Sequence, residues 1–272
     1  MTINEYKIIQ NYLSQSCGIV LGENKQYLVK NRLSSLLKMF DLASFSELTH
    51  SLQTSGPLAL KVKAAVVDAM TTNETFWFRD DMQFLELKEK IFPEIFEKKA
   101  GTVKVWSAAC SSGQEPYTIS MCAEDANKKT GKNRNVQIIA TDISETILTE
   151  AKVAVYSELA LSRGLDMQTK SRFFQKTHDG YKLNLDITRK VRFQQFNLLK
   201  PFSVLGRFDV IFCRNVLIYF SDEVKQDILS RMVSSLEPGG YLFLSSTEAM
   251  PNSIKNLEVV RDGKARYFKK VS

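Results

Sequence analysis

Histidine and cysteine are scarce in this 272-residue chain, and the few present exclude several kinds of chemistry. His50 and His178 are its only histidines, and each stands in a polar stretch typical of a surface helix end or a turn. A mechanism that depends on a histidine acid or base is therefore not expected. No Cys-x-x-Cys pair occurs and no histidine lies near a cysteine, so we expect reduced, mostly buried thiols and no metal site: Cys17, Cys110, Cys122 and Cys213.

Long apolar segments are also missing. No window holds 18 uninterrupted apolar residues, and the N-terminus lacks a basic segment followed by an apolar one. We therefore expect a cytoplasmic protein that is not inserted in a membrane. The composition, with 44% hydrophobic and 25% charged residues, is that of a globular protein. The net charge of +7 is compatible with nucleic acid or with an acidic protein partner.

Residues 1–70 carry apolar side chains at helical spacing throughout. Gly22 and the run at 54–57 (Thr-Ser-Gly-Pro) interrupt this spacing where turns are expected. The pattern predicts a small helical bundle, whose apolar positions include Ile9, Leu13, Leu33, Leu36, Phe45, Leu48, Val62 and Val66.

From about residue 103 the pattern changes to short β-branched or aromatic runs. These predict strands at 103–106, 136–139, 191–193, 208–212 and 241–244. Helical patterns separate most of them, at 116–127, 145–154 and 222–236. Strands that alternate with helices predict an α/β fold with a mostly parallel sheet covered on both faces. We therefore expect a helical domain over 1–70, a linker over 71–82 and an α/β domain over 83–272.

One stretch of the α/β domain has a different pattern. Between about 165 and 195, apolar runs at 173–174, 181–185 and 191–193 flank Asp179 and Gly180. Asp-Gly between such runs is a hairpin signal. We expect a small antiparallel insertion here.

Polar side chains follow the predicted strands at the sheet edge where open α/β sheets bind ligands. After the first strand, 107–116 is rich in small residues but has Gly113 as its only glycine, so it favours a ligand without phosphates, beside Glu115, or an ordinary loop. After the second strand stands Asp142, which could accept hydrogen bonds from ribose hydroxyls or serve the N-terminus of the next helix.

Two further segments carry polar groups of the same kind. Arg214 and Asn215 follow a buried strand directly, with Tyr219 nearby, and need partners from a ligand or from a structural network. In the linker, Asn73, Thr75 and Arg79 stand at alternating positions, which in an extended segment share one side. By itself the aromatic-rich linker favours an interdomain plug.

These segments together resemble the CheR family of chemotaxis receptor methyltransferases. The motifs are Gly-Ile-Val-Leu at 18–21, Asn-Arg-Leu at 31–33, Thr-Asn-Glu-Thr-Phe-Trp-Phe-Arg at 72–79, Ser-Gly-Gln-Glu-Pro-Tyr-Thr-Ile at 112–119, Ala-Thr-Asp-Ile at 140–143, Asn-Leu-Leu at 197–199, Phe-Asp-Val-Ile-Phe-Cys-Arg-Asn-Val-Leu-Ile-Tyr-Phe at 208–220 and Pro-Gly-Gly-Tyr-Leu-Phe-Leu at 238–244. Gln114 and Cys110 depart from the commonest family pattern.

The resemblance implies a Rossmann-like methyltransferase domain that uses S-adenosyl-L-methionine and releases S-adenosyl-L-homocysteine. It implies methyl transfer to glutamate side chains on the cytoplasmic signalling helices of methyl-accepting chemotaxis receptors. In the family, the positions of Arg79 and Tyr219 lie next to the transferred methyl group and the incoming carboxylate. The implied cofactor residues are Asn73, Thr75, Arg79, Glu115, Asp142, Asn197, Leu198, Arg214 and Asn215, and the implication overturns the plug interpretation of the linker.

This activity would explain the scarcity of histidine. A glutamate side chain, with an ordinary pKa of about 4.3, is already an anionic nucleophile at neutral pH and needs no general base. Proximity and orientation are then the main catalytic task. We expect Arg79 and Tyr219 to aim one carboxylate oxygen while the other attacks.

The basic stretch at 25–38 offers a partner for an acidic receptor helix. Lys30 and Lys38 lie on the polar face of a predicted helix, where they either serve the receptor or are merely solvated. Arg32 falls in the apolar arc, and we expect it to point across a cleft toward the substrate helix. Some family members also hold a receptor tail peptide with a glycine-rich loop in the antiparallel insertion. Here the loop at 176–181 has a single glycine, so we expect no need for the tail.

Two other functions remain to be distinguished. A nucleic-acid methyltransferase would also be basic, but amino-methylating members carry Asn/Asp-Pro-Pro-aromatic after the fourth strand, where this chain has Cys-Arg-Asn-Val at 213–216, and no aromatic and basic stripe appears. A non-catalytic adaptor would not need Arg79, Glu115, Asp142 and Tyr219. We expect a monomeric enzyme without nucleic-acid partners.

Overall fold

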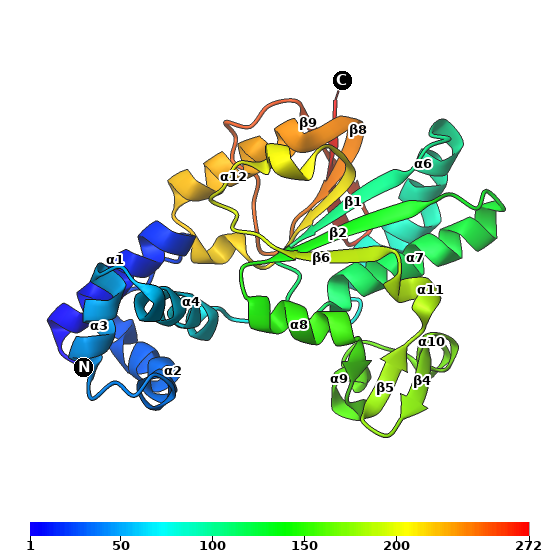
Figure 1. Cartoon of the computed structure of the whole chain (residues 1–272). Helices are drawn as coiled ribbons and strands as arrows, with labels where there is room; N and C mark the ends of the chain where they lie inside the picture. Colours follow the sequence, from blue (N-terminus) through cyan, green and yellow to red (C-terminus); the bar gives the residue numbers. More distant parts are fainter. Residues whose placement is uncertain (272) are drawn as a thin grey trace.

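The computed structural model describes residues 1–271, in which a helical bundle precedes an α/β domain (Figure 1). Residues 1–70 form the bundle, as predicted, and its core includes Ile9, Leu13, Leu33 and Val62, all fully buried. Its elements are α1 (Ile3–Cys17), η1 (Glu23–Lys25), α2 (Gln26–Met39), α3 (Phe45–Gln53) and α4 (Pro57–Met70).

Local sequence signals set the ends of these helices. Thr2 and Glu5 form a capping box at the start of α1. Gly18 ends α1 in the left-handed conformation with φ of 78°. The Ser44 side chain caps α3, and Pro57 occupies the first turn of α4, where its missing N–H costs nothing. Capping residues and turns therefore set where the helices of the bundle begin and end.

The remaining elements build the α/β domain. They are α5 (Asp81–Glu86), η2 (Leu87–Ile91), α6 (Phe92–Lys98), β1 (Val103–Ala108), α7 (Gln114–Thr130), β2 (Val136–Asp142), α8 (Glu145–Val153), β3 (Val155–Tyr156), α9 (Glu158–Ser162), α10 (Met167–Phe173), β4 (Phe174–Thr177), β5 (Gly180–Leu183), α11 (Leu185–Thr188), β6 (Val191–Gln195), η3 (Phe202–Leu205), β7 (Phe208–Cys213), η4 (Leu217–Tyr219), α12 (Asp222–Ser235), β8 (Leu236–Phe243), β9 (Leu257–Asp262) and β10 (Ala265–Lys270).

The large sheet has the order β6-β2-β1-β7-β8-β10-β9. Each neighbouring pair from β6 to β8 is parallel, whereas β10 pairs antiparallel with both β8 and β9. The chain order reverses beside β1, which makes the carboxyl ends of β1, β2 and β7 the expected ligand site. The predicted Rossmann-like, mostly parallel α/β fold is confirmed.

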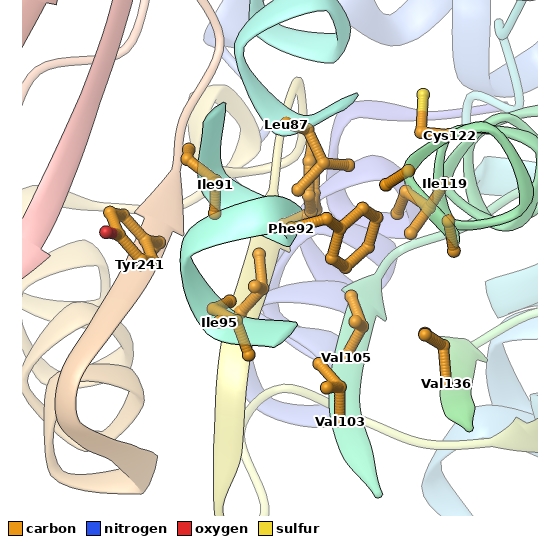
Figure 2. Close-up of a cluster of buried hydrophobic side chains, with 14 of the residues drawn as sticks. Leu87, Ile91, Phe92, Ile95, Val103, Val105, Ile119, Cys122, Val136 and Tyr241 are labelled. Carbon is orange, nitrogen blue, oxygen red and sulfur yellow. The ribbon is translucent and has the colours of Figure 1, made fainter. Parts of the chain in front are cut away.

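Both faces of this sheet are covered because alternate residues of each strand point to opposite sides. On one face, Val103 and Val105 of β1 pack against η2, α6 and α7, and Figure 2 shows Phe92 and Ile119 in this cluster. On the other face, Trp106 packs with Phe208 and with Ile228 of α12. Burial on both faces explains the apolar run at 210–213 in β7.

The antiparallel insertion exists, but its bounds differ from the predicted 165–195. Its sheet has the order β3-β5-β4 and begins at Val155, while β6 (Val191–Gln195) belongs to the large sheet. The predicted turn is correct, because Thr177 pairs with Gly180 around Asp179. Strand β3 has only two residues, too few to leave an alternating pattern in the sequence. In Figure 1 this small sheet projects from the α/β domain, away from the blue N-terminal helices.

Two parts of the α/β domain were not predicted. The helical segment at 81–98 covers the sheet with Phe84, Phe92 and Phe96, and the hairpin β9–β10 completes the sheet edge. An Asp-Gly signal at 262–263 marks that hairpin in the sequence. Among the helices at residues 1–271, none is long and apolar enough to cross a membrane.

Candidate functional site

A cavity of about 1030 Å³, including the space at its mouth, opens where the linker after α4 meets the strand ends. It brings together every residue for which a cofactor or catalytic role was predicted: Asn73, Thr75, Arg79, Glu115, Asp142, Asn197, Leu198, Arg214, Asn215 and Tyr219. The roles of these residues stay predictions, but their common location agrees with them.

Asp142 ends β2 at the cavity wall with its carboxylate largely buried. Oδ2 accepts the backbone N–H of Ser111 (2.8 Å) and Oδ1 accepts that of Ser144 (3.0 Å). Burial raises the pKa of this carboxyl, and these N–H groups work in the opposite direction. The bond to Ser144 matches the predicted helix-terminus alternative, and the position at the cavity wall is compatible with the predicted ribose alternative.

A buried ion network lies next to Asp142. Arg214 donates from Nη1 to Glu115 (3.0 Å) and from Nη2 to Asp80 (2.8 Å), and Nη2 also donates to the carbonyl of Arg79. Glu115 additionally accepts the hydroxyl of Ser107 (2.8 Å). Burial raises the pKa of the Glu115 carboxyl, while the Arg214 charge opposes that shift. The network ties α7, the linker and the end of β7 together.

The linker forms one wall of the cavity. The guanidinium of Arg79 lies 5.2 Å from the ring centre of Phe76 and donates to the carbonyl of Glu74 (3.3 Å). Ser111 donates its hydroxyl to the carbonyl of Asn73 (2.9 Å), which joins the linker to the loop after β1. Arg79 therefore reaches the cavity through a cation–π contact and a single weak hydrogen bond, and keeps most of its N–H donors for a ligand.

The bundle forms the opposite wall, with Cys17 and Ile19. Asn197 donates its side-chain N–H to the carbonyl of Ser16 (2.7 Å), and Val20 donates its backbone N–H to the carbonyl of Tyr219 (2.9 Å). Both domains therefore shape the cavity. Asn197 and Tyr219 are thereby tied to α1 and to the segment that follows it.

The cysteines of the cavity have no nucleophilic character. Burial, together with the charges of Asp142 and Glu115, raises the pKa of the Cys110 thiol well above its ordinary value. Burial, together with the charges of Glu248 and Glu115, likewise raises the pKa of the Cys213 thiol in β7. Both stay protonated at neutral pH, and a thiol of this kind is inert. Cys17 and Cys122 are likewise buried and free, which confirms the prediction of reduced, buried thiols.

The predicted receptor-facing residues lie on α2, outside the cavity. Lys30 and Lys38 are exposed, as predicted for the polar face. The interpretation of Arg32 needs correction: its Nη1 donates to the carbonyls of Met70 (2.8 Å) and Thr71 (3.1 Å) instead of pointing across a cleft. Arg32 lies in the apolar arc because it neutralises the carboxyl-terminal end of α4, a favourable place for a cation.

The sequence analysis missed several residues that shape the cavity. Asp80 holds Arg214, and a helix-start signal before 81 would have marked it. Ala109 and Ser111 adopt left-handed conformations with φ of 58° and 51°, a strained turn of the kind that clusters at functional sites. Glu248 binds the loop after β7, and nothing in its local sequence reveals this.

Comparison with known proteins covers nearly the whole chain. Residues 4–71 match the family described as CheR methyltransferase, all-alpha domain, and residues 73–265 match CheR methyltransferase, SAM binding domain. The chain is 46% identical over 259 residues to "Chemotaxis protein methyltransferase" of Vibrio anguillarum, covering 94% of this chain and 93% of the relative. It is 45% identical over 262 residues to "Chemotaxis protein methyltransferase 1" of Pseudomonas aeruginosa, covering 94% of each.

The fold, the cavity and the matching SAM-binding domain define an S-adenosylmethionine-dependent methyltransferase. The residues present suit that cofactor: Asp142 at a strand tip for a ribose, apolar Ile143, Phe196 and Leu198 for a base, and a buried Arg214 whose Nε has no partner in the described chain. The two family matches cover the helical bundle and the α/β domain, respectively. The chain belongs to the CheR family of methyltransferases, and the resemblance on which the sequence analysis rested is confirmed.

Proposed function

We propose that this protein methylates glutamate side chains of methyl-accepting chemotaxis receptors and so produces glutamate methyl esters for sensory adaptation. The observation that carries the proposal is the convergence of Arg79 and Tyr219 on one cavity whose lining includes no histidine. We further propose that it acts in the cytoplasm, as a monomer, on the receptor signalling helices and independently of a receptor tail peptide.

The cofactor would be held by the residues that line the cavity. When bound, S-adenosylmethionine supplies an electrophilic methyl group. Asp142 would accept the ribose hydroxyls, and Asn73, Thr75 and Asn215 would add polar contacts. Arg214, fixed by Glu115 and Asp80, presents a buried positive charge that suits an amino-acid carboxylate.

The substrate carboxylate needs orientation more than activation. Arg79 has free N–H donors at the cavity and Tyr219 has a hydroxyl there, so each can hydrogen-bond one carboxylate oxygen and leave the other to attack. Neutral Cys110 offers no competing nucleophile. Orientation of this kind can lower a barrier by roughly 7–11 kcal/mol, which makes a general base unnecessary.

Base lability of the product tests the reaction. Labelled methyl transfer to receptor-bearing membranes is expected to give a product that releases volatile methanol in base, because an ester hydrolyses whereas a methylated nucleobase or amine does not. Receptors truncated at their C-terminal tail are expected to be methylated equally well. Base-stable label would contradict the glutamate assignment, and no transfer at all would favour an adaptor. A lower rate with the truncated receptors alone would contradict tail independence.

Removal of the tyrosine hydroxyl tests the orientation mechanism. Tyr219→Phe is expected to lower turnover on the order of 10- to 100-fold while cofactor affinity stays within about twofold, because the hydroxyl touches only the incoming carboxylate. Arg79→Ala is expected to lower both turnover and cofactor affinity. Steady-state kinetics and calorimetry with S-adenosylhomocysteine separate the two effects. Unchanged turnover in Tyr219→Phe would remove its assigned role.

Charge on α2 is proposed to guide the receptor helix. Arg32 holds α2 against Met70 and Thr71, beside the linker that lines the cavity, so the exposed Lys30 and Lys38 belong to a helix that docks next to the site. We expect Lys30→Glu with Lys38→Glu to weaken receptor binding, and wild-type binding to weaken with added salt. Lys264→Glu, an exposed charge reversal between β9 and β10, is the matched control. Receptor binding that is unchanged both by added salt and by the paired charge reversal would contradict a receptor-binding role for Lys30 and Lys38.

A further inference from the structure

Glu248 is a buried carboxylate to which neither the cofactor nor the substrate gives a role. It follows β8 and its side chain is 5% exposed. Oε1 accepts the backbone N–H groups of Val216 (3.1 Å) and Leu217 (2.8 Å), and Oε2 accepts that of Asn215 (3.0 Å). Three successive amides of the loop after β7 therefore converge on one side chain.

The same carboxylate is fixed from its own side of the sheet. Oε2 also accepts the backbone N–H of Ser245 (3.0 Å) and its hydroxyl (2.7 Å). The guanidinium of Arg266 in β10 donates to the backbone carbonyl of Glu248. Glu248 thus joins the end of β8 to the loop after β7 through hydrogen bonds to a charged acceptor, the stronger kind.

The loop held in this way leads directly to the tyrosine. Asn215 adopts a left-handed conformation with φ of 59°, which turns the following amides toward a common anion site. Leu217 then begins η4, which ends at Tyr219. On the opposite side, Phe220 packs so closely on α1 that a Cβ added to Gly18 would lie 2.7 Å from its ring.

The other end of the same loop has separate support. Arg214 is held by Asp80 and Glu115 and makes no contact with Glu248. Loss of the Glu248 charge would therefore release the segment from Asn215 to Tyr219 while the buried Arg214 keeps its partners. Asn215, one of the proposed cofactor contacts, would be released as well, so cofactor binding is expected to weaken, but less than turnover falls because Arg214 stays in place.

We propose that Glu248 is a positioning residue that sets the Tyr219 hydroxyl against the substrate carboxylate. The inference rests on the proposed function of Tyr219. Glu248→Gln keeps the shape of the side chain but replaces one acceptor oxygen with an amide NH2 group that faces N–H donors. We expect it to lower turnover about tenfold or more and to change S-adenosylhomocysteine affinity by less than about threefold.

A double-mutant cycle with Tyr219→Phe provides the decisive measurement. If Glu248 acts through the tyrosine, the two substitutions together lower turnover little more than Tyr219→Phe alone. Asp209→Asn is the matched control: Asp209 is another buried carboxylate, at the opposite end of β7, bound to Lys99 (2.7 Å) and to the N–H of Lys104 (2.8 Å). It is expected to lower the melting temperature and leave turnover unchanged.

The outcomes distinguish the positioning role of Glu248 from the proposed function of Tyr219 on which it rests. If Tyr219→Phe is inactive and Glu248→Gln is not, or if the two effects multiply, the positioning role is wrong and the tyrosine assignment stands. If Tyr219→Phe is fully active, the function assigned to Tyr219 is wrong. Should Glu248→Gln not fold, Ser245→Ala removes one hydrogen bond to the same carboxylate and is expected to lower turnover about two- to fivefold. Unchanged turnover there would overturn the proposal.

Discussion

Arg214→Ala is expected to lower the free energy of unfolding by about 3–5 kcal/mol and to abolish measurable S-adenosylhomocysteine binding. The side chain of Arg214 is 2% exposed and pairs with Asp80 and Glu115. Removal of the cation leaves the largely buried Glu115 carboxylate without its counter-charge, beside Asp80, whose side chain is 33% exposed. The desolvation penalty of Glu115 is then uncompensated. The linker also loses the donor that binds the carbonyl of Arg79. Stability and binding are therefore both affected.

Chemical denaturation and calorimetry together measure these effects. Arg189→Ala is the control, because Arg189 pairs with Asp186 at the surface (3.2 Å), where both side chains are mostly exposed, and such pairs contribute about 0–1 kcal/mol. Arg214→Met combined with Glu115→Gln is expected to recover part of the stability without restoring binding, since it removes charge from the site. Binding of wild-type strength by Arg214→Ala would contradict the proposed contact of Arg214 with the cofactor.

The sequence predicts the strand ends well because their signals are local. A strand buried on both faces must be a continuous apolar run, so the polar group that follows it marks the sheet edge. Asp142 and Arg214 are predicted in this way, whereas the family resemblance assigned Asn73, Thr75 and Arg79 to the site, because the linker by itself favoured a plug. The cavity contains all of these residues.

Residues that act across long sequence separations could not be predicted. Glu248 binds amides about 30 residues earlier, and Arg32 binds carbonyls about 40 residues later. Glu248 does not differ locally from a solvated charge in a loop. Arg32 stands out in the apolar arc of its helix, but only the tertiary structure shows which groups it binds. The helical segment at 81–98 was not predicted for another reason. A π-helical turn at Leu87–Ile91 interrupts it, and its apolar side chains face the sheet.

The contact between Gly164 and Trp77 is a further long-range feature, and it places the antiparallel insertion against the cofactor linker. The backbone N–H of Trp77 donates to the carbonyl of Arg163 (3.1 Å), and its ring is fully buried against Tyr156 and Phe174. Gly164 has φ of 99°, and a Cβ there would lie 2.0 Å from the carbonyl oxygen of Trp77. A displacement of the linker at Trp77 would therefore disrupt this packing.

Gly164→Ala is accordingly expected to lower the free energy of unfolding by about 3 kcal/mol or more, from backbone strain and from overlap with the Trp77 carbonyl together. Gly131→Ala is the matched control: Gly131 also has positive φ, at 66°, but open space around it, so only the strain of about 1–2 kcal/mol applies. Denaturant titration compares the two. Because the linker carries Asn73, Thr75 and Arg79, Gly164→Ala is also expected to weaken S-adenosylhomocysteine binding under conditions where it stays folded, and Gly131→Ala is not. Equal stability and equal affinity in the two variants would show that the insertion does not hold the linker in place.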